Sequence, residues 1–223
     1  YVVIEMDIGR IITTKKELQC VLPLIAIDKE TGGPVTEFTK KVRVCRHGSY
    51  STWDTHSFND LTPDKNANVN LPRHPEFAAS IIEMGEGCWL FKIDWKDSFR
   101  QLFINDRFWH YQGYKILGVD LVDTCLTYGT RAGSKLTHEF GIAINKAFIA
   151  YLKRNKLLKK GEKVLISKCE DIIIKHYIDD HCGAIQAVKE RAEIILNLYY
   201  EFIFNCGIEE SKHKRSGLLQ RIE

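Results

Sequence analysis

An acidic turn between two apolar runs constrains this chain more than any other feature of its sequence. The tetrad Tyr-Ile-Asp-Asp at 177–180 stands between the apolar runs 172–176 and 181–185. That pattern predicts two strands joined by a tight hairpin. Two adjacent carboxylates repel one another, and a bound divalent cation, which prefers carboxylate oxygens, relieves the repulsion. Taken alone, the tetrad is more typical of a solvated surface turn, so the metal-binding interpretation needs a second observation.

A second apolar run also ends in a carboxylate. Residues 88–94 read as a strand that ends at Asp94. The chain between Asp94 and the acidic turn is long enough to bring the two strands side by side, with a helix between them. Three carboxylates at one sheet edge suit two metal ions about 3.5–4 Å apart, which activate the attacking oxygen and stabilise the leaving oxygen in phosphoryl transfer. Asp94, Asp179 and Asp180 are therefore the candidate metal ligands.

Several segments resemble, in the family's order, the motifs of reverse transcriptases. The segments and the motifs they resemble are 22–29 with 40–45 (the fingers segment that holds the triphosphate), 92–101 (motif A), 128–134 (motif B), 177–180 (motif C) and 207–212 (motif D). The resemblance covers roughly residues 20–220 and is best to retroelement enzymes of the DIRS-type and LTR-retrotransposon group. It departs from the family in motif B, where Thr127 precedes Tyr128 and Ser134 replaces a proline.

The resemblance implies an α+β fold, the right-hand polymerase architecture with an antiparallel palm sheet packed on helices. Residues 1–72 would form a fingers-like region and residues 73–223 the palm. The family's motif E and helical thumb do not follow within the 223 residues. We therefore expect the chain to be a piece of a longer polyprotein.

The activity implied by the resemblance is RNA-directed DNA synthesis. Asp94, Asp179 and Asp180 would be catalytic and would hold two Mg²⁺ ions, with Mn²⁺ as a possible substitute. The expected partners are an RNA template, a DNA primer and deoxynucleoside triphosphates. The further site residues implied are Trp95 (a metal ligand through its backbone carbonyl), Lys41 and Arg43 (triphosphate), Phe99 (a steric gate against ribonucleotides), Tyr128 and Gly129 (sugar pocket) and Lys212 (proton donor to pyrophosphate).

Two other functions stay open. An RNA-dependent RNA polymerase shares the palm and the acidic hairpin, but such enzymes typically place an aspartate five residues after the motif A aspartate, where this chain has Phe99. A non-catalytic relic, kept as a scaffold or RNA-binding module, is the other alternative. The three retained carboxylates count against it, because clustered carboxylates without a metal only destabilise a fold.

Composition limits the environment rather than the activity. The net charge is only +3 and 44% of the residues are hydrophobic, so binding to nucleic acid would depend on local charge. Seven cysteines are scattered without a CxxC pair, which favours a reducing intracellular compartment, cytoplasmic or nuclear, over secretion. No apolar run approaches the ~20 residues of a membrane helix, so we expect no membrane partner.

The remaining elements are predicted from periodicity and from turn residues. Gly85 and Gly87 would end the first helix, Ser134 would cap the second, and Gly207 would end the third. The predicted helices are 75–84, 134–151 and 187–205, and the predicted strands are 42–45, 107–112 and 114–117.

Overall fold

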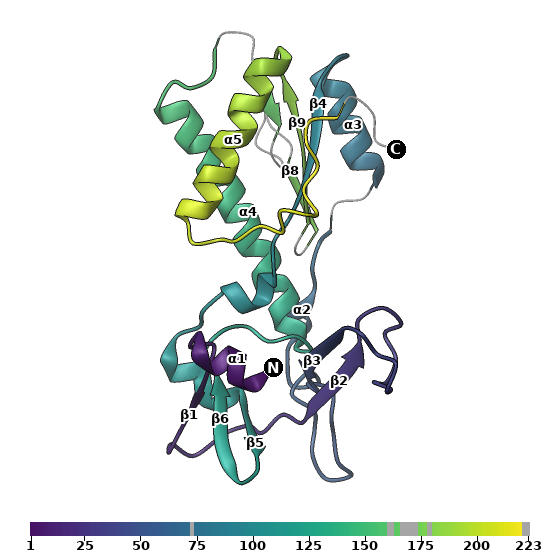
Figure 1. The fold of residues 1–223 in the computed structure, drawn as a ribbon, viewed down its shortest axis with the longest axis vertical. Coiled ribbons are helices and arrows are strands. Elements are labelled where there is room, and N and C mark those ends of the chain that lie inside the picture. The colour runs from purple at the N-terminus through teal and green to yellow at the C-terminus, as the bar shows by residue number, and fades with distance from the viewer. Residues whose placement is uncertain (72–73, 160–162, 166–173, 178–179, 220–223) are drawn as a thin grey trace. The chain divides into compact units, whose positions relative to one another are not determined.

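The computed structural model describes residues 1–71, 74–159, 163–165, 174–177 and 180–219 (Figure 1). The chain forms two compact units, each built from two separate stretches. The first unit comprises Tyr1–Asn68 and Phe99–Lys135, and the second comprises Val69–Ser98 and Leu136–Glu223. One of the predicted catalytic residues, Asp179, lies outside the described residues.

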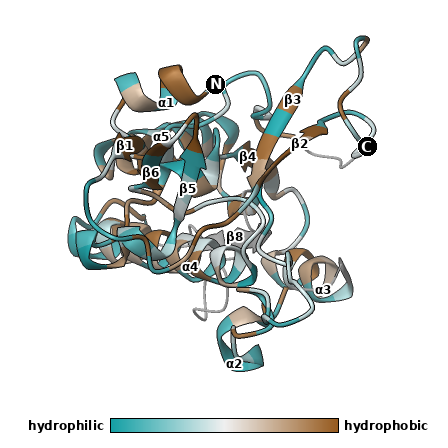
Figure 2. Ribbon diagram, turned by 90° about the horizontal axis from the view of Figure 1, so that it is seen from below, coloured by the Kyte–Doolittle hydropathy of each residue, from teal (hydrophilic) through white to brown (hydrophobic). Residues whose placement is uncertain are grey.

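The first unit contains two small antiparallel sheets. One has the strand order β1-β6-β5 and the other pairs β2 with β3. Ile11, Tyr114 and Leu121 form its buried apolar cluster. Figure 2 shows that β2 is largely apolar, although two of its five residues are exposed. The elements of this unit are α1 (Val2–Asp7), β1 (Ile11–Thr13), β2 (Leu24–Asp28), β3 (Val42–Arg46), α2 (Asp64–Ala67), the 3₁₀ helix η2 (Asp106–Tyr111), β5 (Gly113–Ile116) and β6 (Val119–Asp123).

The second unit is a sheet flanked by helices. Strand β9 pairs with β4 on one side and with β8 and β7 on the other, always antiparallel. Helices α4 and α5 pack together through Phe148, whose ring lies 4.9 Å from that of Tyr199. Its elements are α3 (His74–Met84), β4 (Trp89–Asp94), β7 (Lys163–Leu165), β8 (Ile174–Tyr177), β9 (Asp180–Gln186), α5 (Lys189–Asn205) and most of α4 (Arg131–Arg154). The short 3₁₀ helix η1 (Ser98–Gln101) begins at Ser98, the last residue of the stretch Val69–Ser98, and continues into the first unit.

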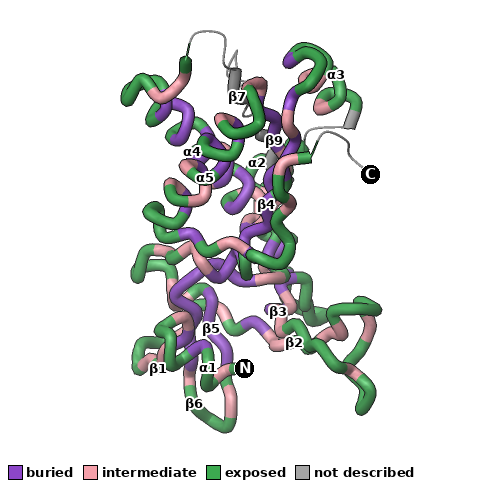
Figure 3. The backbone as a smooth tube through the Cα atoms, turned by 45° about the horizontal axis from the view of Figure 1, so that its top comes forward, coloured by how far each residue is buried: buried purple, intermediate pink, exposed green. Residues whose placement is uncertain are grey.

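The helices cover both faces of this sheet. Figure 1 shows α3 on the opposite side of β4 and β9 from α4 and α5. Figure 3 shows buried residues running along β4, β9 and the facing sides of α4 and α5. The alternation of β4 accounts for its packing on the α5 side, since Phe91 and Ile93 are buried while Lys92 between them is exposed, and the Phe91 ring lies 6.2 Å from that of Tyr199 in α5.

The helix predictions with glycine stops are confirmed. Helix α3 ends at Met84, and Gly85 and Gly87 then take φ values of +96° and +79°. Helix α5 ends at Asn205, followed by Gly207 with φ +80°. These left-handed conformations favour glycine because they are strained for residues with a Cβ. The predicted strands 42–45 and 114–117 correspond to β3 and β5.

Two element predictions are wrong. Helix α4 begins at Arg131 and not after a cap at Ser134, because the side chain of Asn59 accepts a hydrogen bond from the backbone N–H of Arg131 at 2.9 Å. Residues 107–112 form most of η2 and not a strand. There the side chain of Asn105 accepts from the backbone N–H of Arg107 and starts a helical turn.

The architecture is thus a mixed α and β fold with small antiparallel sheets. The compact units do not divide at residue 72, since Phe99–Lys135 joins the N-terminal stretch. The assignment of residues 1–72 to fingers and 73–223 to a palm stays a prediction. Among the described residues, no helix is both long and apolar enough to cross a membrane.

Candidate active site

Two of the predicted catalytic carboxylates are direct neighbours across a strand pair. Strands β4 and β9 pair in a register that sets Asp94 opposite Asp180. Opposed residues in an antiparallel pair have Cβ atoms about 4.5–5.5 Å apart and share one face of the sheet. Asp179 lies outside the described residues, so its predicted place beside them stays a prediction.

The same register sorts the neighbouring side chains onto two faces. Lys92 and Cys182 form the next pair on the face of Asp94 and Asp180, because side chains alternate along each strand. The Asp94 side chain is only 8% exposed, whereas that of Asp180 is 33% exposed. The Asp94 carboxylate is therefore nearly buried, whereas the Asp180 carboxylate lies closer to solvent, at the rim of the site.

Each of these two carboxylates forms an ion pair with a lysine. The ammonium nitrogen of Lys214 lies 3.1 Å from Asp94 Oδ2, and that of Lys92 lies 3.1 Å from Asp180 Oδ2. Partial burial works against the charged form of Lys92, but the hydrogen bond to Asp180 and the charge of its carboxylate raise the pKa of Lys92 above its usual value. The pair of carboxylates thus attracts cations.

Lys214 is a residue that the sequence did not indicate. Lys212, which was predicted to serve the leaving group, is exposed in the turn that carries Lys214. The preceding backbone fixes this turn, since Lys214 N–H donates to the carbonyl of Ser211 at 2.8 Å. Lys214 and Asp94 are 120 positions apart in the sequence, so no local sequence pattern could predict their contact.

Residues 209–219 bring this turn to the site by running along the outer edge of β4. Their backbone bonds to β4 at several points: Ser211 N–H donates to the Asp94 carbonyl at 2.8 Å, and Ser216 N–H donates to the Lys92 carbonyl at 3.0 Å. Covering a strand edge in this way satisfies backbone groups that would otherwise be open to pairing with another chain. Here it also delivers Lys214 to Asp94.

A buried polar cluster supports the strands from the other face. The ring of His181 packs 4.5 Å from that of Trp95, next to the two aspartates in sequence. The hydroxyl of Tyr199 donates to Asn145 Oδ1 at 2.5 Å, and His181 Nδ1 lies 3.1 Å from that hydroxyl. Burial raises the pKa of Tyr199 well above its usual value, so the phenol stays a donor. Helices α4 and α5 therefore fix β9 at the position next to Asp180.

The donor set fits a hard divalent cation such as Mg²⁺. Two carboxylates face each other on one surface and already attract ammonium groups, and carboxylate oxygens are the ligands that Mg²⁺ prefers. In the part of the chain that the structure describes, no group of three His, Cys, Asp or Glu side chains could hold a metal ion. The predicted third carboxylate is that of Asp179, and its role and that of the Trp95 carbonyl stay predictions.

The predicted sugar-pocket residues gather in the first unit. The ring of Phe99 lies 4.8 Å from that of Tyr128, and the guanidinium of Arg43 lies 5.4 Å from the same tyrosine ring. Gly129 has φ +97°, and a Cβ there would collide with the carbonyl oxygen of Arg46. Only glycine allows these two backbones to approach so closely.

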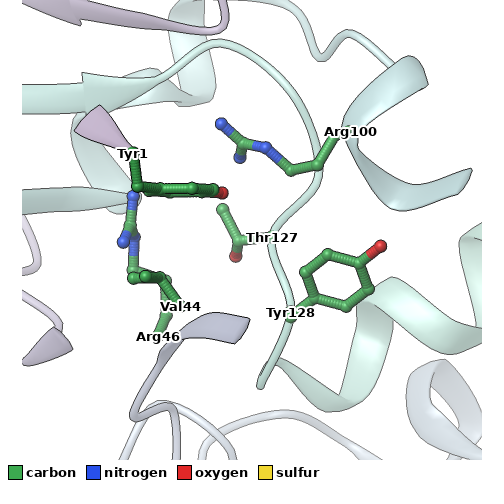
Figure 4. A pocket seen from close by; sticks show the side chains of 6 residues that line it. All are labelled: Tyr1, Val44, Arg46, Arg100, Thr127 and Tyr128. Carbon is green, nitrogen blue, oxygen red and sulfur yellow. The ribbon is translucent and has the colours of Figure 1, made fainter. Parts of the chain in front are cut away.

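Lys41 and Gly133, also in the first unit, make contacts of different kinds. Lys41 pairs with Glu30 at 3.5 Å, and both side chains are mostly exposed. Gly133 in α4 packs against Phe99, because a Cβ there would lie 3.0 Å from the Phe99 ring. Figure 4 shows a small pocket beside this group, lined by Tyr1, Val44, Arg46, Arg100, Thr127 and Tyr128.

Comparison with solved structures places the fold among those of reverse transcriptases. No model of a protein family and no curated protein matches the chain. A foamy viral protease-reverse transcriptase in complex with double-stranded DNA matches 98% of the chain, at a TM-score of 0.63 and 15% identity. The native prototype foamy virus protease-reverse transcriptase matches 95% of it, at a TM-score of 0.58 and 13% identity. The chain spans 30% and 22% of these two proteins, respectively.

At these identities the likeness shows the fold alone, which is reverse-transcriptase-like. The likeness to foamy virus proteins does not bear on the predicted membership of the DIRS-type group, which stays a prediction.

Proposed function

We propose that this chain is the polymerase domain of an RNA-directed DNA polymerase. It would extend a DNA primer on an RNA or DNA template, with deoxynucleoside triphosphates as substrates. The observation that carries the proposal is the register of β4 and β9, which sets Asp94 opposite Asp180 on one face of the sheet. The reverse-transcriptase-like fold supports it.

In this proposal the carboxylates hold the metal ions. Asp94 and Asp180, together with Asp179 and the Trp95 carbonyl, would bind Mg²⁺ or Mn²⁺. When bound, two such ions supply charge stabilisation to the attacking and leaving oxygens of an in-line displacement. Asp94 is almost buried and would fix the position of its ligand atoms, while Asp180 at the rim would adapt to an incoming triphosphate.

The residues of the first unit would bind the nucleotide. Phe99 and Tyr128, whose rings are in contact, would lie under its sugar, and Phe99 would exclude the 2′-hydroxyl of a ribonucleotide by steric clash. Gly129 would allow close approach of the backbone. Lys41 and Arg43 would neutralise the triphosphate, Arg43 through bidentate contacts. Lys212 is proposed to give a proton to pyrophosphate.

Nucleic acid is the proposed macromolecular partner. One of the neighbouring structures is a complex with double-stranded DNA, and the net charge of +3 is compatible with such a partner. We propose that the enzyme acts inside the cell, in the cytoplasm or the nucleus.

The experiment is primer extension on a primed RNA template with the full product of this gene, in Mg²⁺ and with deoxynucleotides. Replacing Asp94 with Asn removes a charge that holds the metal ions, so Asp94→Asn should lower the rate by at least about 10²–10³-fold, the scale of losing one key electrostatic group. Asp120→Asn is the matched control, since Asp120 pairs with Lys115 in the first unit.

Three outcomes would count against the proposal. Equal rates for the wild type and Asp94→Asn would remove the assigned role of the carboxylates. Extension with ribonucleotides in preference would indicate an RNA polymerase. Binding of template without any synthesis by the wild type would indicate a non-catalytic scaffold.

A further inference from the structure

Four charged side chains form a buried network in the first unit. Glu5, Arg46, Arg100 and Asp123 are between 0% and 7% exposed. Arg100 donates from Nε and Nη2 to Glu5 Oε2 at 2.9 and 2.7 Å, and from Nη1 to Asp123 Oδ1 at 2.7 Å. The other oxygen of Asp123 accepts from Arg46 Nε at 2.7 Å. Asp123 therefore joins the two arginines, one on each carboxylate oxygen.

The network is balanced in charge and geometrically specific. It holds two cations and two anions, so no buried charge is left uncompensated. Burial is the largest single influence and opposes the charged form of Arg100, but the charge of Asp123, further nearby negative charge and the hydrogen bond to Glu5 together raise the pKa of Arg100 above its usual value. Arg46 also lies over the ring of Tyr114, with 3.8 Å between the guanidinium carbon and the ring centroid. Buried ion pairs of this kind contribute little net stability compared with apolar side chains of the same volume, because removing the charges from water costs free energy.

Each arginine is joined through the backbone to one of the two aromatic residues of the predicted sugar pocket. The backbone N–H of Arg46 donates to the carbonyl of Tyr128 at 2.9 Å, and the Arg46 carbonyl packs on Gly129. Arg100 follows Phe99 in η1. Asp123 thus connects the segment that holds Tyr128 to the segment that carries Phe99, and the rings of these two residues lie 4.8 Å apart.

We infer that the network of Glu5, Arg46, Arg100 and Asp123 is a positioning device that sets the contact between Phe99 and Tyr128, and through it the choice of sugar. The choice of sugar rests on the proposed function, whereas the positioning does not. Glu5 orients the fork of Arg100, Arg100 orients Asp123, and Asp123 fixes Arg46. None of the four touches the nucleotide in this assignment.

The first test is structural and needs no activity. Arg100→Lys keeps the positive charge, but a single ammonium group cannot reproduce the planar fork that bridges Glu5 and Asp123. Asp123→Asn is the second variant. In the 223-residue chain with selectively labelled aromatic rings, nuclear Overhauser contacts between Phe99 and Tyr128 should be weakened or lost in both variants.

The matched control is Arg10→Lys. Arg10 approaches the other oxygen of Glu5 at 3.7 Å from a partly exposed position and makes no bridge to Asp123 in the described structure. The ring contact should persist in this control. Persistence in folded Arg100→Lys and Asp123→Asn would overturn the positioning role. Failure of both variants to fold would overturn it too, because the network would then serve stability alone.

The second test is kinetic. The ratio of kcat/KM for a deoxynucleotide over the matching ribonucleotide is measured in the full gene product, with Phe99→Val as the reference for lost discrimination. Arg100→Lys should lower the ratio by about tenfold or more, since a displaced ring leaves room for a 2′-hydroxyl, while its Mg²⁺ dependence stays that of the wild type. Arg10→Lys should leave the ratio unchanged.

The two tests separate the inference from the proposed function. A wild type that makes DNA, with the same ratio in Arg100→Lys, would overturn the role in sugar choice. A wild type that makes no DNA would refute the proposed function, and the ring contacts would still decide the positioning role.

Discussion

Single residues at the candidate active site already mimic part of what a metal ion would do. Lys214 and Lys92 each neutralise one carboxylate of the Asp94–Asp180 pair. Both ammonium groups are half exposed, so each pair contributes little to stability in water. In the proposed metal site they would act as competitors, because an ion that bound Asp94 Oδ2 would have to displace Lys214.

The metal affinity should therefore rise when Lys214 is removed. We expect Lys214→Met to lower the dissociation constant for Mn²⁺ by up to about fivefold, the equivalent of the roughly 1 kcal/mol of a part-exposed ion pair. Titration followed by electron paramagnetic resonance measures this without any turnover. Lys212→Met, which removes the same charge two positions away, should change the affinity less. Equal shifts in the two variants would show that only net charge matters.

The sequence indicated the residues of the site better than their partners. Asp94 and Asp180 could be picked out because each ends or begins an apolar run, and the structure sets them opposite each other. The lysines could not be picked out. Lys92 lies inside a predicted strand, where nothing in the sequence distinguishes it from any other exposed strand residue. Lys214 reaches Asp94 only because residues 209–219 run along β4. Contacts that depend on such long-range backbone pairing leave no local pattern in the sequence.

At the scale of elements, helices α4 and α5 fix the strand that carries Asp180. Their polar cluster of Asn145, His181 and Tyr199 is buried behind β9. A buried cluster of this kind is sensitive to the loss of one member, because the remaining polar atoms keep the desolvation cost without the bond.

Tyr199→Phe should accordingly lower the free energy of unfolding by about 1–3 kcal/mol. Its neighbour offers a matched control, since Tyr200 is partly buried and its hydroxyl makes a long hydrogen bond of 3.4 Å to the Ser216 carbonyl. Tyr200→Phe should stay within about 0.5 kcal/mol of the wild type. Urea unfolding followed by circular dichroism compares the two. Similar losses for both variants would contradict the role assigned to the cluster.

Element prediction succeeded where the signals were local and failed where they were not. Helices α3 and α5 could be predicted because apolar periodicity and a following glycine lie in the same stretch of chain. The start of α4 could not, since its cap comes from Asn59, far away in sequence. Residues 107–112 were predicted as a strand from their aromatic content, but the cap at Asn105 favours a helical turn. Aromatic residues fit either element, and capping decides between them.

At the scale of the whole molecule, burial of Cys125 makes stability depend on alkaline pH. Burial, assisted by the charge of Asp123 and opposed by Arg100, raises the pKa of Cys125 from an ordinary value of 9.0 to about 12. The folded state therefore holds the thiol proton more tightly than the unfolded state does. This contribution to stability is fully present below pH 9 and is lost as pH rises from 9 through 12.

The free energy of unfolding of the wild type should thus fall more steeply between pH 9 and 12 than that of Cys125→Ala. Other groups titrate in the same range in both proteins, so the difference between the two curves isolates the thiol. Cys206→Ala is the control: Cys206 is exposed, and partial burial raises its pKa by less than that of Cys125, so its curve should depart much less from that of the wild type. A curve for Cys125→Ala that departs no more than that of Cys206→Ala would sink the assignment.

The interleaving of the two compact units has a consequence for synthesis on the ribosome. The first unit needs both Tyr1–Asn68 and Phe99–Lys135. Glu5 and Arg46 therefore emerge early, while Arg100 and Asp123, their partners in the fold, are translated much later. At about 5–20 residues per second, the delay from residue 68 to residue 135 is of the order of 3–13 s. Until Arg100 and Asp123 have been made within that interval, Glu5 lacks the guanidinium that pairs with it and Arg46 lacks its carboxylate, so water remains the better environment for both charges. We therefore expect the nascent N-terminal stretch to stay open until the residues that complete its unit have been made.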